Sequence, residues 1–261
     1  GGGFGGRGGR GGAHRLKVVV YDMDGNAIRT YSTQADSGMT RIFWDGRYDG
    51  VRFPSRQEAR PDADLPGGAE VLPGTYKMVV SLGDQKDSTM VTIHGDPRLN
   101  ISMEDRKAKI AAYKEMYKMV EPATEAFNRI REAQKTIKTV NDALANADDK
   151  TKREMTKLGK SLQDSLTALE NLFMDPDDQK GIVRSSDNLN SSIFGVSRYL
   201  SASDGAPNQA AQRMIEKAKM DLTEVLNKVN NFFSNDFTEY KQKVEAAQFS
   251  LFKAYEPIKM N

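Results

Sequence analysis

Alternating apolar and polar residues run from Ala13 to about Arg98 and predict short strands rather than helices. Asp24-Gly25 and Gly83-Asp84 are typical hairpin turns between such segments. The stretch 47–72 is rich in Pro, Gly and Asp, and we expect it to form a long loop. Five strands are predicted, at 16–22, 27–32, 40–46, 73–83 and 87–95. Together they predict a small antiparallel β-sandwich over 14–98, preceded by a Gly-rich flexible segment at 1–13.

Helical spacing replaces this alternation after Ser102, which forms a capping-box start with Asp105. Apolar residues then recur every three or four positions, as on the buried face of a helix. Four such segments follow one another, beginning near Ser102, Thr151, Leu189 and Met214. They predict an antiparallel four-helix bundle over residues 99–261.

The lengths of these helices predict a stem. The first and last each span about 45 residues, roughly 65 Å, and the middle two are much shorter. We therefore expect a two-helix stem built from 103–121 and 236–255, with kinks near Pro122 and Ser234-Asn235. Two helices cannot bury all the aromatic residues of such a stem, so these are candidate partner-facing residues. They are Tyr113, Tyr117, Phe249, Phe252 and Tyr255.

The short motifs of the strand region suit structural roles. Trp44 is a large apolar side chain for a small sandwich, and Asp45-Gly46 turns the chain. Pro73-Gly74 starts a strand whose Tyr76 is placed to bury its ring and to bond through its hydroxyl. These residues are expected to hold the fold rather than to contact a ligand.

The order of these motifs resembles a known module. The segments "VVVYDMDGNAIRTYS", "RIFWDGRYDG", "LPGTYKMVV" and "GDPR" resemble the immunoglobulin-like module of the flagellar hook-capping type. They are more closely similar to the C-terminal region of bacterial exported proteins with a sortilin-like or BNR-repeat β-propeller, and "LSASDGAPNQAA" resembles the break before that family's last helix.

This resemblance implies an immunoglobulin-like sandwich, an Asp96-Pro97-Arg98 linker and a helical bundle. It also implies that the sandwich lacks its first strand, which would leave an open edge beside Leu16–Tyr21. The upstream propeller of the same protein would be the partner, together with other envelope or secreted proteins. Any hydrolase or peptide-binding activity would belong to the propeller, and the protein would be exported.

Composition and charge disfavour several classes of function. The chain has no cysteine and two histidines, His14 and His94, neither of which lies in a nucleophile motif. The net charge of +2 lacks the basic excess of a nucleic-acid-binding domain. Asp22–Asn26 and Asp175–Gly181 only faintly resemble calcium loops. No enzyme activity, cofactor, metal or membrane-spanning segment is therefore expected.

Two other functions stay open. The 47–72 loop, with Tyr48, Arg52, Phe53, Arg56 and Arg60, could form the surface of a carbohydrate-binding or adhesin-like module. An exposed aromatic platform would favour that function, whereas a loop packed on the bundle would favour scaffolding. RNA binding through "GGGFGGRGGRGG" is the weaker alternative, because two RGG-like units and one Phe make a short tract.

Overall fold

A computed structural model describes residues 14–35, 38–144, 148–176 and 187–247. The chain forms two compact units, which we call the sheet unit and the helical unit. The sheet unit comprises the described residues up to Arg52, together with Glu58–Lys114 and Asp204–Ala206. The helical unit comprises Phe53–Gln57, Glu115–Ser203 and the described residues from Pro207 onward.

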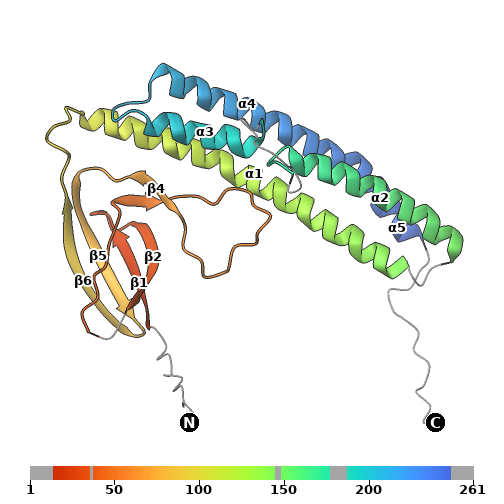
Figure 1. Ribbon diagram of the computed structural model, residues 1–261, viewed down its shortest axis with the longest axis horizontal. Coiled ribbons are helices and arrows are strands. Elements are labelled where there is room, and N and C mark those ends of the chain that lie inside the picture. Colours follow the sequence, from red (N-terminus) through yellow and green to blue (C-terminus); the bar gives the residue numbers. More distant parts are fainter. Residues whose placement is uncertain (1–13, 36–37, 145–147, 177–186, 248–261) are drawn as a thin grey trace, which may run out of the picture. The chain divides into compact units, whose positions relative to one another are not determined.

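The strands precede the helices along the chain, as the sequence predicts (Figure 1). The strands are β1 (His14–Tyr21), β2 (Ala27–Ala35), β3 (Arg47–Asp49), β4 (Gly67–Glu70), β5 (Gly74–Leu82) and β6 (Gln85–Ile93). The helical segments are α1 (Met103–Ala143), α2 (Asp149–Asn171), α3 (Leu189–Ser201), α4 (Gln209–Phe232), the π-helix η2 (Phe233–Phe237) and α5 (Thr238–Ala246). No helix in the described ranges has the length and apolar character needed to cross a lipid bilayer.

The sheet unit contains a four-stranded antiparallel sheet in the order β2-β1-β5-β6 and a two-stranded sheet of β3 and β4. A small core holds Val20, Ile28, Val71 and Tyr76, with Trp44, Tyr48, Met78 and Ile93 packed against it. The Trp44 and Tyr76 rings meet edge to face, with their centroids 5.2 Å apart. These contacts place residues of both sheets around one apolar centre.

Three expectations about the strands are wrong. The stretch 40–46 contains no strand, because Trp44 bends back to donate its indole N–H to the Arg47 carbonyl and Gly46 has a φ of +69°. The next strand begins at Arg47 and pairs with β4, inside the stretch expected to be a loop. Moreover, Leu16–Tyr21 is no open edge, because β1 pairs with β2 on one side and β5 on the other.

The predicted two-helix stem is also wrong. Glu115 in the first half of α1 lies beside α4, where Lys219 Nζ is 2.5 Å from Glu115 Oε1. The end of α1 contacts α2, because Asn141 crowds Gly159, and α5 lies beside the start of α2. The helices α1 and α4 therefore run in the same direction, and α2 and α3 together return along them (Figure 1). Sequence alone does not reveal that two short helices lie end to end.

Local signals fix where the helices begin. Ser102 Oγ accepts the Asp105 N–H, and Asp148 accepts the N–H groups of Lys150 and Thr151. Asn208 accepts the Ala211 N–H and caps α4. These bonds satisfy backbone donors that have no partner inside the first turn of a helix.

Candidate functional site

One edge of the four-stranded sheet is closed by carboxylates. Asp49 accepts the Thr30 N–H of β2, with N···O distances of 3.2 Å to both oxygens. Asp64 accepts the Ser32 N–H at 2.9 Å, and Arg29 Nη1 donates to Asp49 Oδ1. Side chains of β3 and of the loop between β3 and β4 thus accept the outward amides of β2, which prevents another strand from pairing there.

The opposite edge of the sheet is β6. Leu82 pairs with Gln85 across a two-residue turn, and Gly83 has a φ of +57° in its first position. Because hydrogen-bonded and non-hydrogen-bonded pairs alternate, the N–H and C=O groups of Ser88, Met90 and Thr92 point away from β5. The Ser88 N–H is taken by the Asp87 carboxylate at 2.7 Å. Met90 and Thr92 therefore offer backbone groups to which an added strand could bond.

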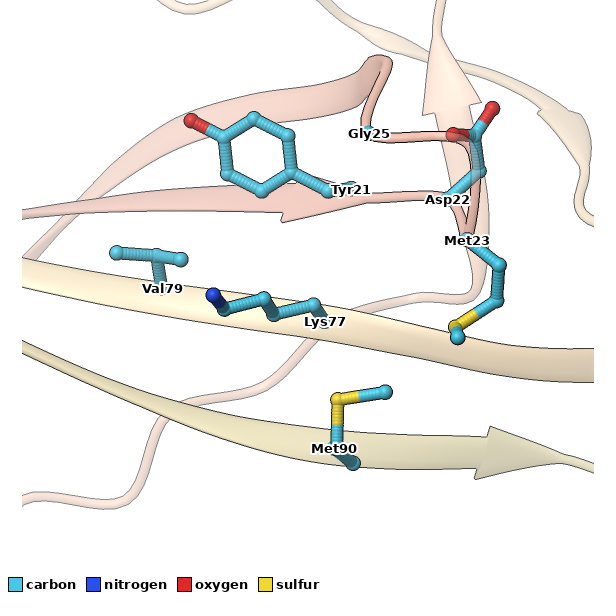
Figure 2. Close-up of a pocket in the computed structure, with 7 residues that line it drawn as sticks. All are labelled: Tyr21, Asp22, Met23, Gly25, Lys77, Val79 and Met90. Atoms are coloured by element: carbon cyan, nitrogen blue, oxygen red, sulfur yellow. The ribbon is translucent and has the colours of Figure 1, made fainter.

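A recess of about 390 Å³ lies next to this edge, on the face of the sheet away from the core. Tyr21, Lys77 and Met90 are paired neighbours on β1, β5 and β6 and form a row across the sheet. Figure 2 shows these three side chains on one side of the strands, with Met23 extending from the β1–β2 turn. Met23 is 68% exposed and Met90 53%, so two flexible apolar side chains meet solvent together.

Asp22 also lines the recess, but its carboxylate is engaged in the turn. Its Oδ1 accepts the N–H groups of Asp24 and Asn26, and its Oδ2 accepts from the Asn26 amide at 3.0 Å. The Asn26 side chain and then the Asn26 N–H hold the pKa of Asp22 below its ordinary value of 3.8. Asp22 is thus a fixed anion that orders the turn carrying Met23, rather than a general base.

We predict that the sheet unit loses stability in acid through Asp22. Because its pKa is lowered on folding, its contribution is present above pH 3.8 and is lost as the pH falls through the lower folded pKa. The chain has a single Trp, Trp44, whose ring packs in the sheet unit, so its fluorescence follows unfolding of this unit. Asp22→Asn should weaken the unit at pH 7 and flatten its acid dependence below pH 4. Asp84→Asn, in the other hairpin turn, should leave the profile unchanged; equal profiles for wild type and Asp22→Asn would refute the prediction.

The residues expected to form a binding loop are engaged within the two units. In the sheet unit, Tyr48 packs half-buried against the core and Arg52 donates to the Ala63 carbonyl. Phe53 and Arg56 belong instead to the helical unit. The Phe53 ring meets Phe194 edge to face at 6.2 Å, and Arg56 Nε donates to Glu170 at 2.5 Å. Arg60 is exposed, whereas the other four predicted residues are half-buried.

The other predicted residues lie in separate places. Asp24-Gly25 forms the β1–β2 turn, with a φ of +84° at Gly25, and Pro73-Gly74 leads into β5. Tyr76 donates its hydroxyl to the Leu72 carbonyl at 2.6 Å, and burial raises its pKa to about 12. In the linker that contains Pro97, the Arg98 guanidinium, 2.6 Å from Asp96, lowers the pKa of that carboxyl. Asp45 accepts the Arg47 N–H at the Gly46 turn.

The aromatic residues expected to face a partner are only partly described. Tyr113 and Tyr117 are half-buried on α1, whereas Phe249, Phe252 and Tyr255 lie outside the described residues. His94 is exposed after β6. The described ranges hold no group of three or more His, Asp or Glu side chains placed to bind a metal ion.

Sequence reasoning missed the row of Tyr21, Lys77 and Met90. A signal was present: Met90 shares strand parity with Lys86, Ser88 and Thr92, so an apolar side chain stands on an otherwise polar face. Comparison of the chain with protein-family models, with curated proteins and with solved structures finds no match. The function must therefore be argued from the geometry of the sheet and from its motif residues.

Proposed function

We propose that the chain is a non-catalytic interaction module, the C-terminal part of an exported β-propeller protein. In this proposal the two sheets are an immunoglobulin-like sandwich that docks on the upstream propeller, and the helical unit engages an envelope or secreted partner. The propeller supplies an extended strand that pairs with β6 and places apolar side chains in the methionine-lined recess.

One observation carries this proposal: one edge of the four-stranded sheet is blocked by side chains, and the other is open. The β2 edge is closed by Asp49 and Asp64, whereas β6 keeps backbone groups directed outward beside Met90. Free edges invite strand pairing and are usually blocked. Strand addition at β6 requires that this edge has backbone groups free to pair, and the exposed methionines beside it offer apolar contacts to the added strand. The blocked β2 edge directs such pairing to β6.

The carbohydrate-binding alternative receives no support from the 47–72 loop. Its Phe53 packs against Phe194, and its Tyr48 packs on the core of the sheet unit. Arg56 binds Glu170 within the helical unit. A sugar platform needs aromatic faces free to stack, and these two aromatic rings already have protein neighbours.

Substitution at Met90 tests the proposal. The polypeptide encoded upstream in the same reading frame would be produced separately, and its affinity for this chain measured by calorimetry. Met90→Lys puts a charge at the edge and in the recess, and should weaken binding by about tenfold or more. The exposed side chain of Met90 leaves the fold little changed by this substitution, which Trp44 fluorescence would verify.

Met220→Lys is the matched control, because Met220 is 73% exposed on α4 and lies in the other unit. It should bind the upstream polypeptide as the wild type does. Failure of the two polypeptides to associate, or equal affinities for Met90→Lys and wild type, would refute docking at β6. Binding of the wild type to insoluble polysaccharides, lost on Arg60→Ala, would instead support the carbohydrate function.

A further inference from the structure

The helical unit has a groove with both apolar and polar lining between the start of α2 and α5. Its volume is about 700 Å³, larger than the recess of about 390 Å³ beside β6. Met155, 6% exposed, and Leu158 line it from α2, and Ala246 and Ala247 line it from the end of α5. The polar lining residues are Thr151, Glu154, Lys157, Ser161 and Lys243. Small alanines opposite long apolar side chains leave room for large apolar groups.

The chain leaves α5 at this groove. The helix ends at Ala246, and Ala247 has extended backbone angles, with φ −79° and ψ 117°. Both residues belong to the groove wall. The polypeptide that follows therefore starts at the groove itself, with no intervening linker to cross.

The sequence that follows is rich in large apolar side chains. Phe249, Phe252 and Tyr255 recur at intervals of three, and Leu251 and Ile258 add to them. Recurrence at three and four positions is the pattern of a segment that buries one face. We propose that residues 248–261 bind back into this groove, with these aromatic side chains against Met155 and Leu158.

Reach and covalent attachment favour this occupant over a separate partner. From Thr151 to Ser161, the groove follows α2 for about 15 Å at 1.5 Å per residue. Residues 248–261 would cover about 21 Å even in a helical conformation, so they can span the groove. A segment tethered at the groove also has an effective concentration on the order of millimolar, so modest apolar contact is enough to hold it.

Disulfide trapping tests the proposal, and the chain suits it because it has no native cysteine. The full chain would carry Leu158→Cys with Phe252→Cys and be oxidised mildly at low concentration. A disulfide needs Cα atoms within about 7 Å. The expected result is an intramolecular disulfide, formed at least about fivefold faster than in the control pair and at a rate that does not depend on protein concentration.

The control pair is Lys160→Cys with Phe252→Cys. Lys160 is exposed on α2 and, two residues from Leu158, points to the other side of the helix. Equal rates for the two pairs would overturn the proposal. Disulfide-linked dimers whose yield rises with concentration would also overturn it, because the groove would then bind a second copy of the chain.

A second measurement covers the case in which cysteine at 158 disturbs packing. Leu158→Asp should release the segment, so that chymotrypsin cleaves after Phe249 or Phe252 several times faster than in the wild type. Far-UV circular dichroism would check that the helices stay intact. Unchanged cleavage in a folded Leu158→Asp protein would count against the groove as the binding site.

Discussion

Arg56→Ala is expected to lower the free energy of unfolding of the helical unit by about 3 kcal/mol, because it leaves a nearly buried carboxylate without its cation. Glu170 lies on the buried side of α2, with its side chain 10% exposed. Arg56 Nε is 2.5 Å from Glu170 Oε1, and Gln134 donates to Oε2 at 2.9 Å. Without Arg56, Gln134 alone would compensate for the charge.

The same substitution would also loosen the chain around Arg56. Its Nη1 donates to the Asp175 carbonyl at 2.8 Å, and Asn190 donates to the Pro54 carbonyl at 3.0 Å. Residues 53–57 therefore join the segment that follows α2 to the start of α3 through hydrogen bonds. Loss of Arg56 should expose this segment to proteases before global unfolding. Ellipticity at 222 nm during urea titration measures the loss of stability.

An exposed ion pair provides the matched control. Arg129 and Glu125 lie four residues apart on α1, with side chains 59% and 61% exposed. Arg129→Ala should cost no more than about 0.5 kcal/mol, as exposed pairs of this spacing do. The double substitution Arg56→Met with Glu170→Met should be milder than Arg56→Ala, because no buried charge remains. Equal losses for Arg56→Ala and Arg129→Ala would show that the Glu170 pair contributes no more than an exposed one.

This network shows where prediction from sequence stops. The apolar stripe of α2 was predicted, and Glu170 falls on it one turn after Leu166. A charge on a buried stripe signals a missing partner, because charged residues are rarely buried unpaired. Nothing near Arg56 indicates that the partner is Glu170, which lies 114 positions away. Local patterns predict elements, whereas pairing over such a distance depends on how the whole chain folds.

Among the strands, too, local signals allowed correct predictions and the arrangement of distant segments did not. The alternation and the Asp24-Gly25 turn correctly predicted β1 and β2, because both signals are local. The strand β4 was missed because its Gly67-Gly68 start carries no side-chain pattern. A Cβ on Gly67 would lie 2.8 Å from Asp45 Oδ2, so a larger residue there would require the Asp45 side chain to move. The open edge at β6 could not be predicted, because it depends on the order of strands in the sheet.

Gly50→Ala is expected to destabilise the sheet unit by about 2 kcal/mol through overpacking. Gly50 is buried, and its N–H donates to the Pro66 carbonyl at 2.8 Å. A Cβ at this position would lie 2.9 Å from Pro66 O and 3.1 Å from Gly67 O. Both are backbone oxygens and cannot rotate away as a side chain can. The strands β3 and β4 would have to separate, which Trp44 fluorescence in urea would report as an earlier transition.

Separation of these strands should also open the closed edge of the sheet, because Asp49 precedes Gly50 and accepts the Thr30 N–H. Gly50→Ala should therefore speed hydrogen exchange at the Thr30 amide more than at Val18, which lies in the inner strand β1. Gly205→Ala is the control, since its Cβ meets no atom within 4 Å and should leave both readouts unchanged. If Gly50→Ala lowers stability but leaves Thr30 protected, the carboxylates close the β2 edge independently of the β3–β4 pair. If Gly50→Ala changes neither the urea transition nor hydrogen exchange at Thr30, the backbone at Pro66 moves aside without loss of stability. Close packing of Gly50 is then not what holds Asp49 in place.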